Sequence, residues 1–262
     1  MSESSIPSRP AAFSYPGHGP NARIGVAICH GFTGSPLSLL PWAQHLADQG
    51  YAVTVPLLPG HGTDWRQLAR TSWRDWYSSF EAAFLDLRSQ TDACLVAGLS
   101  MGGAIALLVA ARHDVAGVSL VNPGLSFYDR RVRVIGVLKY VQRTTLPIQE
   151  DQPTAALTDD GDYSRTPLAA VHELKKLFGE AARALPLVAA PVQVFKSRTD
   201  VVVPPTSLAI LRKRLGSRLT EVVELAGSGH VATLDVDAPG IFSGSSDFFR
   251  QHARQTSTLE TP

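Results

Sequence analysis

The sequence predicts an α/β fold with a doubly wound, mostly parallel sheet and an inserted helical cap. Two observations predict it. Short apolar runs alternate with longer segments of helical periodicity, and one interval between two such runs is far longer than a crossover needs. At 262 residues the chain is long enough to bury a large core, so we expect a single domain over residues 1–262.

The predicted strands are short and nearly all apolar, as expected for strands that are buried on both faces of a parallel sheet. They are Ile24–Cys29, Ala52–Pro56, Ala93–Ala97, Val118–Val121, Val192–Phe195 and Glu221–Leu225. Strands that alternate with helices form right-handed βαβ units, which is the basis of the doubly wound arrangement.

A clear helical pattern follows Thr71, where large apolar side chains recur at steps of three and four residues. They are Trp73, Trp76, Tyr77, Phe80, Phe84 and Leu87. We interpret this stripe as packing against the sheet and not as an aromatic binding surface.

The interval from Gly124 to Ala190 breaks the alternation, because about sixty residues separate two predicted strands. It contains two helix-like patterns, Val134–Val141 and Leu168–Leu177. We expect an inserted cap at approximately 124–190, over the C-terminal edge of the sheet. Within its first helix Ile135 and Leu138 are candidate substrate-binding residues that line a tunnel beneath the cap, although packing between cap and body explains them equally well.

Composition and charge exclude several classes of protein. The chain is 44% apolar and 18% charged, and its 24 basic and 23 acidic residues give a net charge of +1. It has no Lys/Arg-rich run, so we expect no nucleic-acid partner. No apolar run approaches the ~20 residues of a membrane span, and the N-terminus lacks an apolar signal region. We therefore expect no transmembrane segment and a cytoplasmic location.

The two cysteines, Cys29 and Cys94, each lie within an apolar strand-like run. We interpret them as buried thiols in preference to a disulfide. The sequence has no HExxH, paired-cysteine or Asp-rich metal pattern, and no dinucleotide or P-loop fingerprint. We expect neither a metal nor a cofactor.

The pentapeptide GLSMG at 98–102 has the G-x-S-x-G pattern, between a predicted strand and an Ala/Leu-rich helix. A sharp strand–turn–helix connection needs residues without side chains on either side of a nucleophile, because the backbones come close there. Such a turn exposes Ser100 Oγ above the sheet and directs the amide of Met101 toward a developing oxyanion. A glycine-rich turn without chemistry is the alternative.

A serine hydroxyl needs a base, and His230 is the best placed of the eight histidines. It follows the last predicted strand after a Gly-Ser-Gly run, which predicts a flexible loop beyond the C-terminal edge of the sheet. Asp200 lies on the loop that leaves the preceding strand, and the order Ser100, Asp200, His230 is that of a hydrolase triad. Asp235 and Asp237 are alternative acids, which we interpret as caps of the next helix.

Two further loops are candidate parts of the site. The sequence HGFTG at 30–34 directly follows the first strand, and the backbone amide of Phe32 is a candidate second oxyanion donor. In the LLPGHG loop, His61 is a candidate contact for a substrate headgroup, with a structural turn as the preferred alternative.

Five segments in this order, HGFTGSP, LLPGHGT, AGLSMGG, SRTDVVVP and GHVATLD, resemble the bacterial monoacylglycerol lipases and small carboxylesterases of the α/β-hydrolase superfamily. The resemblance implies the α/β-hydrolase fold and hydrolysis of monoacylglycerols or other short- to medium-chain esters without a cofactor. It also implies a small-molecule or lipid-like ester as the partner. An acyltransferase or thioesterase with the same triad is the first alternative, and a ligand-binding module without turnover is the second.

Overall fold

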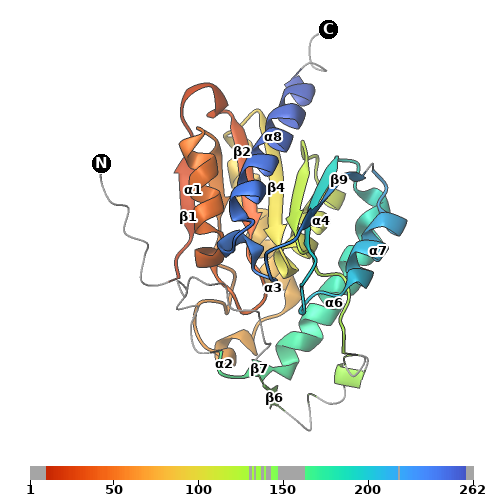
Figure 1. Cartoon of the computed structure of the whole chain (residues 1–262). Coiled ribbons are helices and arrows are strands. Elements are labelled where there is room, and N and C mark those ends of the chain that lie inside the picture. Colours follow the sequence, from red (N-terminus) through yellow and green to blue (C-terminus); the bar gives the residue numbers. More distant parts are fainter. Residues whose placement is uncertain are drawn as a thin grey trace.

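The computed structural model describes residues 10–129, 132, 134–136, 139, 143–146, 163–217 and 219–257. A seven-stranded sheet forms the centre, with the order β1-β3-β2-β4-β5-β8-β9 (Figure 1). Its strands are β1 (Phe13–Pro16), β2 (Ile24–Cys29), β3 (Ala52–Val55), β4 (Ala93–Leu99), β5 (Val118–Val121), β8 (Val192–Ser197) and β9 (Leu219–Leu225). All pairs are parallel except β1 with β3. The mostly parallel α/β sheet and its six predicted strands are confirmed.

Helices cover both faces of the sheet. On one face lie α3 (Trp73–Ser89), α4 (Met101–Arg112) and α6 (Leu168–Ala184), and on the other lie α1 (Leu40–Asp48) and α8 (Ala238–Ser257). Adjacent residues of β2 illustrate the division, because Ala27 packs into the first layer and Val26 into the second. This is the alternation of side chains expected for a strand that is covered twice.

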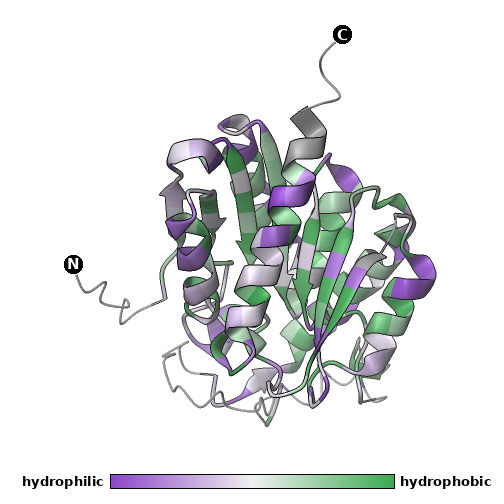
Figure 2. Cartoon of the chain, turned by 45° about the horizontal axis from the view of Figure 1, so that its top comes forward, coloured by the Kyte–Doolittle hydropathy of each residue, from purple (hydrophilic) through white to green (hydrophobic). Residues whose placement is uncertain are grey.

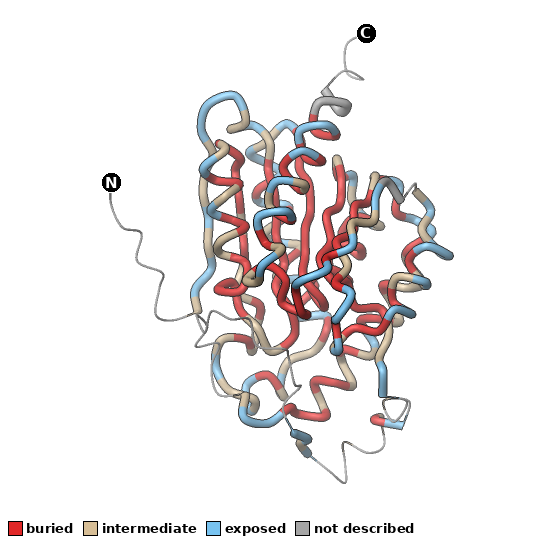
Figure 3. Tube along the Cα trace, viewed as in Figure 1, coloured by how far each residue is buried: buried red, intermediate tan, exposed pale blue. Residues whose placement is uncertain are grey.

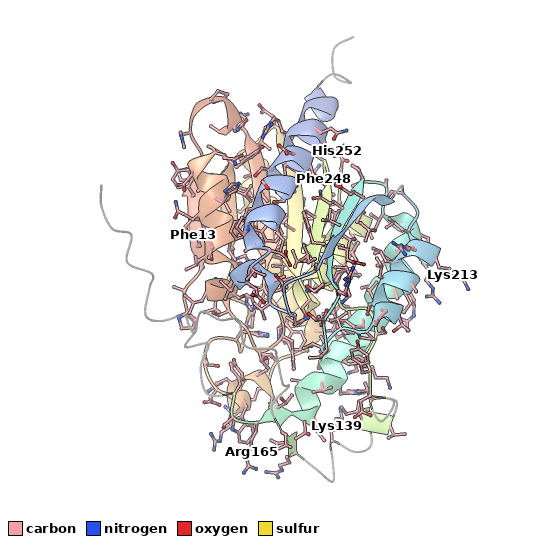
Figure 4. All side chains as sticks on the ribbon, in the orientation of Figure 1. Phe13, Lys139, Arg165, Lys213, Phe248 and His252 are labelled. Atoms are coloured by element: carbon pink, nitrogen blue, oxygen red, sulfur yellow. The ribbon has the colours of Figure 1, made fainter. Side chains whose placement is uncertain are left out.

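Burial follows the hydropathy of the sequence. Apolar residues concentrate on the central strands, whereas the outer faces of the helices are polar (Figure 2). The strands β2, β3, β4, β5 and β8 are buried along most of their length (Figure 3). All six residues of the predicted aromatic stripe on α3 are buried, and Ser72 and Asp75 form a capping box at its N-terminus. On α8, Phe248 and His252 lie on the buried side (Figure 4).

Both cysteines are free and buried, as predicted for strand thiols. Burial raises the pKa of Cys94 to about 12 and raises that of Cys29 well above its usual value. Across the described ranges, every helix is too short or too polar to cross a membrane.

Part of the predicted cap lies within the described residues. It contains a short antiparallel pair, β6 (Thr144–Thr145) with β7 (Thr166–Pro167), followed by α6, which extends the predicted helix at Leu168–Leu177. The apolar side of α6 packs against α4 and α3. Of the other predicted helix, only residues 134–136 and 139 are described, so the cap as a unit stays a prediction.

The carboxyl ends of the parallel strands lie at one edge of the sheet, which positions the candidate site. Leu99 pairs with Val121, and Val121 pairs with Phe195, so these strands end nearly level. Beyond the same edge lie α2 (Trp65–Leu68), β6 and β7, at the bottom of Figure 1. Loops at this edge of an α/β sheet converge on one place.

Candidate active site

Ser100 lies in a strained turn between β4 and α4. Its backbone has φ 56° and ψ −117°, a combination that L-residues rarely adopt. The flanking glycines make the turn possible. A Cβ on Gly98 would lie 2.4 Å from the carbonyl carbon of Gly102, and one on Gly102 would lie 2.0 Å from the carbonyl oxygen of Cys29. The backbone atoms at both positions are in direct contact and leave no space for a side chain, as predicted.

The loop after β2 runs against this turn. A Cβ on Gly31 would lie 3.5 Å from Ser100 Cβ, so the backbone at 31 passes directly beside the serine. Thr33 has a left-handed φ of 62° and its hydroxyl donates to the Phe32 carbonyl at 2.6 Å, which turns the chain sharply there. The structure thus brings the HGFTG and GLSMG segments together. Met101 begins α4, where the first amides have no partner within the helix.

Asp200 and His230 form a buried pair. His230 Nδ1 donates to Asp200 Oδ1 at 3.0 Å, and both residues are buried. The amides of Val202 and Val203 donate to the same oxygen, each at 2.9 Å, while the Lys196 ammonium donates to Oδ2 at 2.5 Å. The carboxylate therefore accepts four hydrogen bonds, which fix its position on the loop after β8.

These contacts determine the ionisation of Asp200. Burial alone would raise the pKa of the carboxyl group, but the hydrogen bond and charge of His230 oppose it, followed by Lys196 and the Val203 amide. Together they lower the pKa of Asp200 to about 2, so the group is a carboxylate at neutral pH. A carboxylate that accepts from Nδ1 fixes the imidazole tautomer and leaves Nε2 as the acceptor.

The loop that carries His230 is held firmly, although its Gly-Ser-Gly sequence predicts flexibility. Asp237 Oδ2 accepts the Gly227 amide and Asp235 Oδ2 accepts the Gly229 amide, both at 3.0 Å. Both carboxylates thus bind the loop backbone. Asp237 also directly precedes α8, and its carbonyl accepts two amides of the first helical turn, so it stands at the capping position that the sequence predicts. His230 itself is bonded to Asp200, not to either of them.

Asn122 connects the two halves of the site. The amide of Ser100 donates to the Val121 carbonyl at 3.0 Å, and the next residue, Asn122, donates from Nδ2 to the His230 carbonyl at 2.8 Å. Asn122 also donates to Ser197 Oγ at 2.9 Å and accepts the Ser197 amide at 2.8 Å. The end of β5 therefore holds the serine turn on one side and the histidine loop on the other.

His61 is a buried turn residue, flanked by Gly60 and Gly62 with φ of 78° and 66°. Its ring packs edge-on against His30 and Trp76, and its Nδ1 lies 3.2 Å from the Pro59 carbonyl. Its Nε2 is buried, and no described residue forms a hydrogen bond with it. Burial and the neighbouring His30 hold the pKa of His61 well below its usual value. This placement agrees with the structural-turn alternative, and a contact with substrate stays a prediction.

Of the two predicted substrate-binding residues, Ile135 belongs to the part of the chain that the structure describes. Ile135 is buried in the core cluster that contains α4 and α6, whereas Leu138 lies outside the described residues. Sequence reasoning missed Asn122 and Lys196. The available signals were a polar residue directly after the predicted strand Val118–Val121 and a lysine directly after the predicted strand Val192–Phe195.

Comparisons with known proteins agree with this architecture. A profile of the alpha/beta hydrolase family matches residues 26–242. The chain is 33% identical to the thermostable monoacylglycerol lipase of Bacillus sp. (strain H-257) over 242 residues, which cover 91% of this chain and 95% of that protein. A solved structure reported with the metagenome-derived lipolytic enzymes LipS and LipT superposes with a TM-score of 0.86 at 32% identity, covering 95% of this chain and all of that one.

A more distant structure, the monoacylglycerol lipase of Paleococcus ferrophilus, shares the fold, with a TM-score of 0.73 at 17% identity over 92% of this chain and 98% of that chain. The matched profile extends from β2 into α8 and includes the serine turn, the Asp200 loop and the His230 loop. The chain belongs to the alpha/beta hydrolase family, among its lipase- and esterase-type enzymes.

Proposed function

We propose that this protein hydrolyses monoacylglycerols or other short- to medium-chain acyl esters through the triad Ser100, His230 and Asp200. The observation that carries the proposal is the buried hydrogen bond between His230 Nδ1 and Asp200 Oδ1, at the same sheet edge as the strained Ser100 turn. The monoacylglycerol lipase of Bacillus sp., which aligns over nearly its whole length, supports the substrate class.

The reaction would proceed in two stages. His230 Nε2 takes the proton from Ser100 Oγ, which attacks the ester carbonyl and forms a tetrahedral intermediate. The amides of Phe32 and Met101 stabilise its oxyanion, and each such donor is typically worth about 10²–10³ in rate. The alcohol leaves with the proton from His230, and an acyl-enzyme remains on Ser100.

Water then repeats the sequence and releases the fatty acid. Asp200 stays ionised at neutral pH, because its pKa is lowered to about 2. Its role is to orient the imidazole and to stabilise the imidazolium that forms in each stage.

Ser100→Ala tests the proposal. We expect hydrolysis of monoacylglycerols and p-nitrophenyl esters to fall by at least about 10³-fold, because the nucleophile is lost while the fold is kept. Ser243→Ala is the matched control, since Ser243 is exposed on α8 and its hydroxyl donates to carbonyls of the same helix. A fluorophosphonate probe should label the wild type and Ser243→Ala but not Ser100→Ala.

A panel of glycerol and p-nitrophenyl esters of graded acyl length tests the substrate class. Activity that is confined to the shortest acyl chains and absent on monoacylglycerols would refute the lipase assignment but not the esterase mechanism. The same reactions with added alcohols or with thioesters, followed by mass analysis of the products, separate hydrolysis from acyl transfer and thioester cleavage.

A further inference from the structure

A buried lysine lies against the acid of the proposed triad. Lys196, at the end of β8, donates to Asp200 Oδ2 at 2.5 Å and to the Val203 carbonyl at 3.0 Å. Its side chain is 13% exposed and that of Asp200 is 0% exposed. Solvent screens the charges of such a deeply buried pair only weakly. The lysine charge therefore acts on neighbouring groups much more strongly than a surface charge would.

The two oxygens of Asp200 are divided between two partners. Oδ1 accepts the imidazole N–H together with the amides of Val202 and Val203, and Oδ2 accepts the ammonium. Lys196 and His230 are therefore bridged by a single carboxylate. When the imidazole takes a proton during catalysis, the new positive charge shares its counter-ion with a cation that is already present.

We infer that Lys196 is a positioning residue that acts through Asp200 to weaken the proton affinity of His230, so that the base works at lower pH than an unshared carboxylate would allow. The inference rests on the proposed triad. Physically, a carboxylate alone favours the protonated imidazole, and a fixed cation on its other oxygen cancels part of that attraction.

The other described charges near the pair are already engaged. Arg198, two residues along the same chain segment, pairs with Glu224, and both side chains are more than half exposed. Asp235, from the turn before α8, binds the Gly229 amide. The Tyr128 hydroxyl, from the segment after β5, donates to the backbone carbonyl of Asp200 at 3.1 Å. Among the described residues, Lys196 is thus the cation bonded directly to the acid.

The test is the pH dependence of kcat/KM in three variants. Lys196→Met removes charge and donor, Lys196→Gln removes the charge but keeps a donor, and Lys196→Arg keeps both. We expect the midpoint of the acidic limb to rise by about 0.5–1 pH unit in the Met and Gln variants, as expected for loss of one nearby buried charge. Activity near pH 6 should fall about 3–10-fold, while the alkaline plateau stays within about 2-fold.

Lys196→Arg should restore the wild-type limb. Arg198→Met is the control. It removes a cation from the same chain segment, but the ion pair of Arg198 is exposed, so the pH profile of kcat/KM should match that of the wild type. If Lys196→Met does not fold, the comparison of the Gln and Arg variants carries the same information. An equal loss at every pH, with no movement of the acidic limb, would show that Lys196 only holds the turn and would overturn the inference.

A measurement without turnover separates this inference from the proposed function. Histidine-labelled protein carrying Ser100→Ala is titrated by NMR with and without Lys196→Met, and the midpoint of the His230 imidazole should rise in the double variant. If it does not move, the inference fails even when Ser100→Ala abolishes hydrolysis. If Ser100→Ala retains hydrolysis, the proposed function fails, and the NMR titration still decides whether Lys196 acts on His230.

Discussion

Asn122 is the residue that organises the site without belonging to its proposed chemistry. Its side-chain amide bonds to the backbone of the His230 loop and to Ser197 on the neighbouring strand, and all of these partners are buried. Its own φ of 45° is left-handed, a conformation that asparagine tolerates better than most residues. Both the side chain and the backbone conformation of Asn122 therefore suit this position.

Asn122→Asp should lower kcat about 10²-fold with little change in KM. The substitution keeps the shape and the oxygen that accepts the Ser197 amide, but it replaces the donor to the His230 carbonyl with an oxygen that repels it. Asn21→Asp is the control, because Asn21 also donates to a backbone carbonyl, that of Gln49, from the short 3-10 helix η1 (Gly19–Asn21) before β2. Equal kinetic losses in the two variants would contradict a role for Asn122 in holding His230.

At the same scale, the predicted triad residues follow from sequence because each depends on local position. Ser100 lies in a recognisable turn, and Asp200 and His230 follow consecutive strands of the sheet. No local sequence pattern identifies Asn122 or Lys196 as part of the site. Asn122 bonds to residues 75 and 108 positions away, and nothing short of the folded arrangement of β5, β8 and the last loop reveals those contacts.

At the scale of elements, the turn from β4 to α4 leaves no space for additional side-chain atoms. The first turn of α4 lies directly on Gly98 and on the end of β2, with no room for one additional carbon. Ten consecutive residues of α4, Met101–Ala110, are buried, since the helix lies between the sheet and the neighbouring helices α3 and α6. Neither the strand nor the helix can move away to accommodate a side chain.

Gly102→Ala should therefore destabilise the protein by more than about 3 kcal/mol or prevent folding, because its Cβ would overlap the Cys29 carbonyl. Gly240→Ala should do the opposite. Gly240 lies on α8 with nothing within 4 Å of an added Cβ, so alanine should stabilise the helix by about 0.5–1 kcal/mol. Urea unfolding of both variants measures the contrast, and similar stabilities would refute the packing argument.

Whether the sequence predicts an element depends on how much apolar surface that element buries. The six predicted strands are mostly apolar runs, and the sequence predicts them to within a few residues, including β9 at the sheet edge opposite β1. By contrast, β1 is four residues long at the edge of the sheet, with alternating partial exposure, and carries too little pattern to be distinguished from a loop. The strands β6 and β7 are two residues long each. They are strands only because they pair with each other in the folded chain.

At the scale of the whole molecule, neutral histidines are part of the core. His30 is fully buried, donates to the Gly31 carbonyl and accepts the Leu58 amide, and burial lowers its pKa to about 4. The adjacent His61 is shifted in the same direction. Protonating either ring places a charge among apolar and aromatic neighbours, which the unfolded chain avoids.

Stability should therefore decline as the pH falls from about 6.5 toward 4. The unfolded chain binds a proton at His30 near pH 6.5 and the folded chain near pH 4, so the contribution is complete above this window and is lost within it. For His30 alone the loss is about 3 kcal/mol. Asp200 adds its own loss only at lower pH, between 3.8 and about 2.

Urea unfolding at pH 7 and pH 4.5 measures this decline. His30→Gln should be less stable at neutral pH but should lose less stability on acidification. An identical decline in the variant and the wild type would show that other groups control the acid sensitivity.

The sealed thiols of Cys29 and Cys94 have a practical consequence for handling this enzyme. Because burial keeps both sulfurs protonated and out of contact with solvent, alkylating and oxidising reagents find no thiolate on the native protein. A thiol-directed electrophile should therefore leave both cysteines of the native protein unmodified, and preparations need no reductant to protect these thiols.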